Sequence, residues 1–129
     1  MVSSRMVVGL GVDIAEIDRL AAALDRWGER IVARLMDADE AARLPRAPDA
    51  RARALAHAVA GKEAASKALG TGWSRGVRWR DVAVRLEPAA VELRAKAREW
   101  AERRGSQGRG ALRFEERDNL VIAEYRLFS

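Results

Sequence analysis

Apolar residues in the first third of the chain predict one strand followed by a helix. Residues 6–14 are rich in valine and read as a short strand. From Ile17, apolar side chains recur at helical spacing as far as Ile31. Gly28 lies inside that pattern, and glycine weakens a helix interior. The pattern therefore predicts a helix that either continues through Gly28 or breaks there.

A second, longer helix is predicted after a proline-containing loop. Pro45 and Pro48 mark the loop, and Asp49 is placed to cap the helix that follows. The helical pattern continues to about Leu69, and Gly70 is expected to end it.

The remainder of the chain predicts one strand, one helix and a closing hairpin. Residues 77–86 alternate, with a change of parity near Asp81 that indicates a bulge. Pro88 suits the first turn of a helix that Gly105 would end. A flexible loop over 105–110 then leads to two strands around a turn at residues 118–119. This order predicts a mixed α+β domain with a mainly antiparallel sheet.

Length and composition favour a single domain over residues 1–129. The chain has 49% hydrophobic residues, which is enough for one core. It contains no run of about eighteen apolar residues that would span a membrane, and its first residues do not resemble a signal peptide. We therefore expect a cytoplasmic protein. The absence of cysteine excludes disulfides and thiolate metal sites, and the single histidine, His57, excludes a multi-histidine site.

The charge favours an acidic partner or a phosphorylated ligand. Lysine and arginine number 24 against 19 acidic residues, which gives a formal net charge of +5. Aromatic residues make up only 5% and no nucleic-acid-binding motif is present, so nucleic acid is not an expected partner. Arg19, Arg26 and Arg30 would form a basic row if the first helix survives Gly28. Such a row is either a docking ridge or an ordinary solvated face.

Two short segments carry the candidate chemistry. Glu63 and Lys67 are four positions apart, so a helix would place them one turn from each other. Asp13 ends an otherwise apolar strand, where a charge is costly unless it is paired or binds a cation. Together they suggest a divided divalent-metal site, although Glu63 and Lys67 alone would read as a common solvated ion pair.

Both segments resemble signatures of a known family. G-V-D-I-A-E-I-D-R at residues 11–19 and G-K-E-A-A-S-K-A-L-G-T-G at residues 61–72 are similar to the two motifs of the holo-acyl-carrier-protein synthases. These are the small 4′-phosphopantetheinyl transferases. The resemblance covers roughly the first two thirds of the chain. It implies the fold of that family, with a long helix packed on the sheet, and a homotrimer with active sites between subunits.

The resemblance also implies roles for particular residues. Asp13 and Glu63 match the metal-binding acids, for Mg²⁺ or Mn²⁺, and Glu63 is the candidate base. Lys67 would neutralise the pyrophosphate of coenzyme A, and Lys62 would lie near it. The backbone around Gly70, Thr71 and Gly72 would approach the nucleotide. On the first helix, Arg19 matches the arginine that meets the acidic acyl carrier protein. Arg26, from the same basic row, is a further candidate for partner binding.

The last third departs from the family pattern. Glu116 stands where the family has a histidine, and could serve instead as a third metal ligand. Ala58 replaces an arginine that the family often carries, while His57 nearby is a candidate phosphate contact.

Two functions are therefore open. One is transfer of 4′-phosphopantetheine from coenzyme A to a serine of an apo acyl carrier protein. The other is a non-catalytic, synthase-like subunit that binds carrier protein, which the loss of the histidine would favour.

Overall fold

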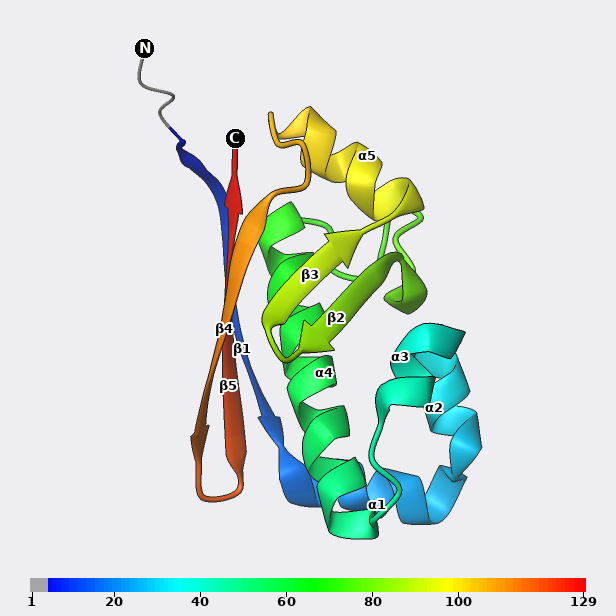
Figure 1. Cartoon of the computed structure of the whole chain (residues 1–129). Helices are drawn as coiled ribbons and strands as arrows, with labels where there is room; N and C mark the ends of the chain where they lie inside the picture. Colours follow the sequence, from blue (N-terminus) through cyan, green and yellow to red (C-terminus); the bar gives the residue numbers. More distant parts are fainter. Residues whose placement is uncertain (1–4) are drawn as a thin grey trace.

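A long helix packed against a three-stranded sheet forms the centre of the molecule (Figure 1). The computed structural model describes residues 5–129. The elements, in chain order, are β1 (Val7–Glu16), α1 (Ile17–Trp27), α2 (Glu29–Leu35), α3 (Ala38–Arg43), α4 (Pro48–Leu69), the short 3₁₀ helix η1 (Trp79–Asp81), β2 (Val82–Leu86), β3 (Ala89–Leu93), α5 (Ala95–Arg103), β4 (Gly110–Arg117) and β5 (Leu120–Phe128).

Both sheets are antiparallel. The larger has the order β1-β5-β4, and the smaller consists of β2 and β3. The helix α4 lies between the larger sheet on one side and the β2–β3 pair with α1 to α3 on the other (Figure 1). This arrangement confirms the predicted α+β class with an antiparallel sheet and a long helix. No helix of the described residues is long and apolar enough to cross a membrane.

Glycines let β1 lie directly on α4. A Cβ atom at Gly11 would overlap the backbone carbonyl of Ala64, and one at Gly9 would overlap that of Ala68. The buried side of α4 is made mostly of alanine, so the helix also presents little bulk to the strand. Strand and helix backbones therefore touch, and this contact fixes where the side chains of β1 stand relative to those of α4.

The predicted first helix breaks at Gly28. This glycine has φ +58, and α1 ends at Trp27 before α2 begins at Glu29. Arg30 therefore lies on a different helix from Arg19, and the continuous basic row does not form. The start of α1 is fixed by the β4–β5 turn, where Asn119 accepts the backbone N–H of Ile17 with its carbonyl oxygen at 2.8 Å.

The predicted cap of α4 is wrong in detail. Ala47 is the residue before the helix, Pro48 opens it, and Asp49 lies inside the first turn, where its charge still suits the helix N-terminus. The C-terminal end of α4 is as predicted, since Gly70 caps the helix in the left-handed conformation at φ +78.

Two expectations for residues 77–105 are also wrong. The segment around Asp81 is a 3₁₀ helix, and the strand β2 begins only at Val82, so the change of parity reflects that helix and not a bulge. Residues 89–93 form strand β3 instead of a helix and pair with β2. The helix α5 starts later, at Ala95, and ends at Arg103, just before Gly105. The closing hairpin and its turn at residues 118–119 are confirmed.

Candidate active site

Packing of β1 on α4 brings an acid and a lysine together from positions 54 apart in the chain. The Lys67 ammonium donates to Asp13 Oδ1 at 2.6 Å and to the carbonyl oxygen of Val12 at 3.3 Å. The side chain of Lys67 remains 52% exposed, so it can turn toward a ligand. The hydrogen bond from Lys67 to Asp13 raises the pKa of Lys67, which stays cationic at neutral pH.

Glu63 completes this cluster from α4. Its Oε2 accepts the indole N–H of Trp73 at 3.2 Å. Burial raises the pKa of the Glu63 carboxyl and repulsion from Asp13 adds to the rise, while the Trp73 hydrogen bond and the Lys67 charge oppose it. The Asp13 charge therefore acts on Glu63, and a cation bound by both carboxylates would relieve that repulsion.

The donor set fits a hard divalent cation. Asp13 and Glu63 offer carboxylate oxygens, and Mg²⁺ commonly binds one or two protein carboxylates while keeping several waters. In the part of the chain that the structure describes, no group of three or more His, Cys, Asp or Glu side chains is placed to hold a metal ion. Water or substrate phosphate oxygens would therefore complete the coordination shell.

Lys62 does not lie where the sequence suggested. Its side chain is fully buried, and the ammonium pairs with Glu40 Oε2 at 2.9 Å. It also donates to the carbonyl oxygens of Trp79 at 3.0 Å and Val82 at 2.6 Å. Burial lowers the pKa of Lys62, and the charge of Glu40 opposes that effect. With these three acceptors, Lys62 is a structural cation inside the protein and not a pyrophosphate contact.

The backbone amides of the Gly-Thr-Gly turn are also occupied. Gly70 N–H bonds to Lys67 O, while Thr71 and Gly72 N–H both bond to Ser66 O, and these bonds close the end of α4. The Thr71 hydroxyl is turned inward and donates to Gly72 O. The expected amide contacts to a nucleotide are therefore not available here, although Gly72 has open space above its Cα.

Two residues at the C-terminal end of α4 belong to no motif that the sequence shows. Trp73 bonds to Glu63 from the loop after α4, and Arg104 lies against Gly70 from the end of α5, donating to Leu69 O at 3.4 Å. Neither belongs to a motif, and Arg104 reaches the turn only through the tertiary fold. The only hint in the sequence that Trp73 could contact the site is its position directly after Gly72.

Glu116 forms a separate cluster with residues from the first half of α4. Its Oε2 pairs with Arg53 Nη1 at 2.8 Å, and its Oε1 lies 3.8 Å from His57 Nε2. His57 Nδ1 lies 2.8 Å from the carbonyl oxygen of Arg53, so that nitrogen carries the hydrogen. Glu116 is thus not a third metal ligand with Asp13 and Glu63 within one chain, because the described residues hold no such group of three.

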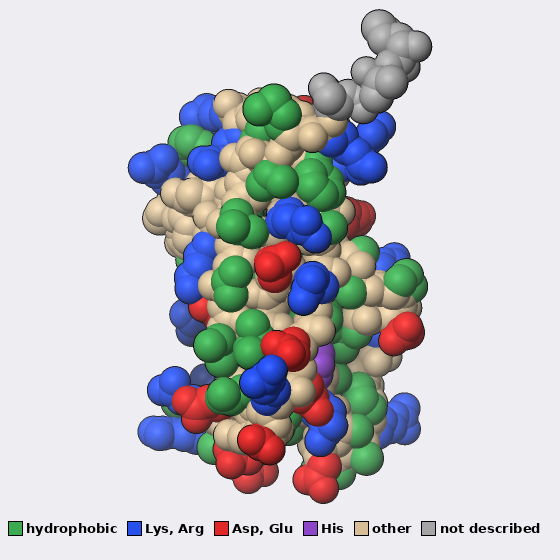
Figure 2. Space-filling model, turned by 90° about the vertical axis from the view of Figure 1, so that its left-hand side faces the viewer, with side chains coloured by type: hydrophobic (Ala, Val, Ile, Leu, Met, Phe, Trp, Pro, Cys, Tyr) green, Lys and Arg blue, Asp and Glu red, His purple; other side chains and the backbone are tan. Residues whose placement is uncertain are grey.

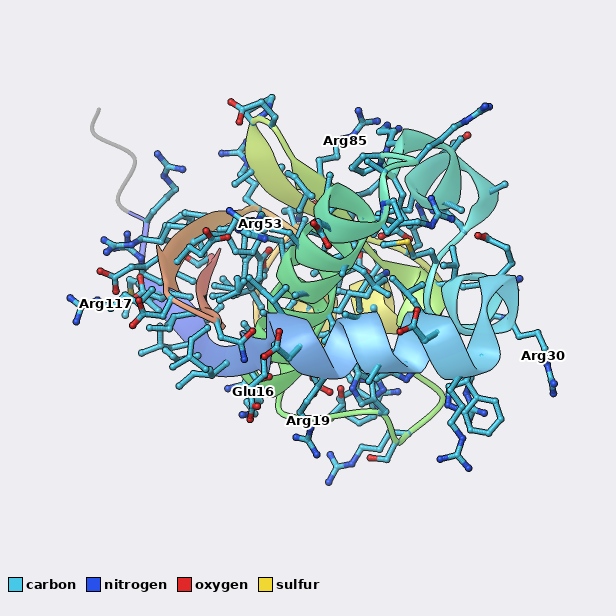
Figure 3. The ribbon with its side chains drawn as sticks, turned by 90° about the horizontal axis from the view of Figure 1, so that it is seen from below. Glu16, Arg19, Arg30, Arg53, Arg85 and Arg117 are labelled. Atoms are coloured by element: carbon cyan, nitrogen blue, oxygen red, sulfur yellow. The ribbon has the colours of Figure 1, made fainter. Side chains whose placement is uncertain are left out.

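The three arginines of the predicted basic row lie on two helices, Arg19 and Arg26 on α1 and Arg30 on α2. Figure 3 shows Arg19 near the start of α1 and Arg30 beyond its end. The Arg26 guanidinium lies over the ring of Trp27, 4.9 Å from its centroid. Arg19 and Arg26 are both exposed and remain on one helix, which keeps two of the three predicted positions together.

Comparison with known proteins identifies the family of this chain. Residues 9–125 match the family model described as the 4′-phosphopantetheinyl transferase superfamily. The chain belongs to this superfamily. Holo-[acyl-carrier-protein] synthase of Alkalilimnicola ehrlichii is 44% identical over 106 residues, covering 80% of this chain and 83% of the relative. That of Sphingopyxis alaskensis is 43% identical over 98 residues, covering 76% and 74%.

Solved structures of synthases share the fold of this 4′-phosphopantetheinyl transferase. The crystal structure of holo-[acyl-carrier-protein] synthase from Neisseria meningitidis has a TM-score of 0.78 at 26% identity, with 95% of this chain and 98% of that chain covered. The synthase from Bacillus anthracis, solved in complex with CoA (3′,5′-ADP), has a TM-score of 0.72 at 25% identity, covering 96% and 98%. The predicted family, fold and class of enzyme are confirmed.

Proposed function

We propose that this chain transfers 4′-phosphopantetheine from coenzyme A to a serine of an apo acyl carrier protein and releases adenosine 3′,5′-bisphosphate. The observation that carries the proposal is the cluster of Asp13, Lys67 and Glu63, which two distant segments build through a backbone-to-backbone contact. The synthase names of the relatives and the coenzyme A bound by the Bacillus anthracis synthase support it.

The chemistry requires charge neutralisation at phosphate and removal of a proton from serine. When bound by Asp13 and Glu63, Mg²⁺ or Mn²⁺ would supply the positive charge that phosphoryl transfer needs. Lys67 would exchange its bond to Asp13 for one to the pyrophosphate. The serine oxygen then forms a bond to phosphorus as the bond to the departing bisphosphate breaks. Glu63 would act as the general base that takes the serine proton.

Carrier-protein docking is assigned to α1. Arg19 and Arg26 are both exposed on this helix, and Arg19 follows Asp13 by six residues. An acidic surface bound at α1 would therefore present its serine close to the metal acids. Electrostatic complementarity of this kind steers association and fixes orientation.

We also propose that the chain works as a homotrimer. Leu10, Val12 and Ile14 are 58%, 47% and 54% exposed on the outer face of β1. Figure 2 faces this sheet and shows hydrophobic side chains interleaved with acidic and basic ones. An apolar strand face with charged neighbours is typical of a surface that other subunits cover. Sites between subunits would then be completed by residues of a second copy.

The non-catalytic alternative gains no support from the surroundings of Glu116. Its contacts are to Arg53 and His57, and they leave the cluster of Asp13, Lys67 and Glu63 intact. A module that only binds carrier protein has no need of two separated acids beside a lysine.

Intact mass spectrometry tests the proposal. Several apo acyl carrier proteins are incubated with the chain, coenzyme A and Mg²⁺, with and without a chelator. The proposal predicts a gain of one phosphopantetheine group that disappears on chelation. No gain on any carrier, while a known transferase modifies the same samples, would overturn it.

A further inference from the structure

Trp73 holds the carboxylate of Glu63 by a direct hydrogen bond. The distance from Trp73 Nε1 to Glu63 Oε2 is 3.2 Å, and both side chains are half-buried. Within residues 5–129 the other oxygen, Oε1, has no hydrogen-bond partner. A glutamate side chain has several rotatable bonds, so fixing it before a ligand arrives removes an entropic cost from binding.

The ring of Trp73 is itself fixed by Trp79. The two indoles are stacked, with centroids 3.8 Å apart and planes inclined by 19°. Trp79 begins the 3₁₀ helix η1, and its carbonyl oxygen accepts the Lys62 ammonium at 3.0 Å. Through Trp79, the indole of Trp73 that binds Glu63 is therefore connected to Lys62 of α4.

A buried ion pair anchors the far end of this connection. Lys62 and Glu40 pair at 2.9 Å with side chains 0% and 3% exposed, and Glu40 Oε2 also accepts the Val84 backbone N–H at 2.9 Å. Lys62 precedes Glu63 in the sequence. Glu63 is thus fixed twice: at its backbone through Lys62, and at its carboxylate through Trp79 and Trp73.

We propose that Trp73 is a positioning residue that sets the affinity of this site for its divalent cation. The inference rests on the proposed function and adds a residue that no motif contains. Each acid of the site then has one donor of its own, because Lys67 holds Asp13 while Trp73 holds Glu63. Hydrogen-bond partners of metal ligands typically change metal affinity or activity by about 10- to 100-fold when lost.

Trp73→Phe tests this role because it removes the indole N–H while keeping a smaller aromatic ring for Trp79 to stack on. Trp100→Phe is the matched control. It also deletes an indole N–H, but that group donates to the carbonyl oxygen of Arg75 at 3.1 Å and not to an acid of the site. Binding of Mn²⁺ is measured from the free-ion electron paramagnetic resonance signal in the presence of coenzyme A, with Mn²⁺ and coenzyme A alone as the blank. Transfer rates are then measured over a range of Mg²⁺ concentrations.

The inference predicts that Trp73→Phe weakens Mn²⁺ binding about tenfold and raises the half-saturating Mg²⁺ concentration by a similar factor. The rate at saturating metal should fall much less, and Trp100→Phe should match the unaltered chain. Equal metal affinity in Trp73→Phe and the unaltered chain, with transfer observed in both, would overturn the role of Trp73 alone. Failure of the unaltered chain to bind Mn²⁺ or to transfer would contradict the proposed function itself, and with it this inference.

Discussion

Among single residues, Tyr125 reports on the folded state, because its hydroxyl titrates in a buried position. It is the only tyrosine in the chain and is 1% exposed. Its hydroxyl has no hydrogen-bond partner within the described residues and lies beside Gly110, where any side chain would overlap it. Burial raises the pKa of Tyr125 to about 12, because the phenolate would be charged in an apolar core.

This environment predicts alkaline instability. A group whose pKa is higher in the folded state than in the unfolded state stabilises the fold fully below its unfolded value of 10.0 and loses that effect as the pH rises toward about 12. The tyrosinate absorbance of the native protein should therefore have its midpoint near pH 12. Tyr125→Phe should raise the free energy of unfolding by about 1 kcal/mol at neutral pH, since an unpaired buried hydroxyl is removed. It should also reduce the loss of stability above pH 10. A midpoint at the ordinary tyrosine value would contradict the buried position.

At the scale of elements, the contact between β1 and α4 predicts the effect of Gly11→Ala. The new methyl group would overlap the carbonyl oxygen of Ala64, so strand and helix must separate. We expect the free energy of unfolding to fall by about 3 kcal/mol, the upper part of the range for overpacking. Chemical denaturation measures this loss. The transfer rate of the folded fraction should fall as well, because Asp13 moves away from Glu63. Unchanged stability and rate would show that the contact does not position the site.

Most helices and strands are predictable from the sequence, but the type of one segment is not. The strand at the N-terminus, the long helix ending at Gly70 and the closing hairpin were predictable, because each has a clear period and a clear stop signal. Residues 89–93 were misassigned because apolar residues at 89, 91 and 93 fit a strand, while the run to Trp100 also fits a helix. Pairing with β2 decides between the two, and a single sequence does not show pairing.

For the candidate site too, some residues are predictable from the sequence and others are not. Asp13, Glu63 and Lys67 were found because they lie in motifs, and the structure brings them together. Lys62 lies in the same motif but points into the core, since the partner that determines its direction, Glu40, comes from α3. The Gly-Thr-Gly motif likewise predicts amide contacts to a nucleotide, whereas in the structure these amides close the end of α4. A residue's place in the motif predicts that it lies near the site. Its partners in the folded structure decide whether it faces a ligand or the core.

At the scale of the whole molecule, the outer face of the larger sheet predicts how copies assemble. Ile14 lies on this face opposite Ile122, with Glu115 in the next strand of the same row. Ile14→Lys would place an uncovered charge at a subunit contact, while the single chain could pair the new ammonium with Glu115. Sedimentation velocity should therefore show a trimer for the unaltered chain and a folded monomer for Ile14→Lys. Ala42→Lys, at an exposed position on α3, is the control and should remain trimeric. A trimer for both variants would exclude this face as the interface.

We propose that the acid pair across β1 and α4 carries metal-dependent transfer. The most direct measurement is the intact mass of an apo acyl carrier protein over time with the unaltered chain and with Asp13→Ala, each over a range of Mg²⁺ concentrations. Asp13 is half-buried and its partner Lys67 is exposed, so its removal should leave the folded structure intact, which circular dichroism checks. We expect steady conversion to the phosphopantetheinylated form by the unaltered chain, and a loss of at least about 100-fold for Asp13→Ala that added metal does not restore. Conversion by Asp13→Ala at the unaltered rate in saturating Mg²⁺ would remove Asp13 from the site and contradict the account.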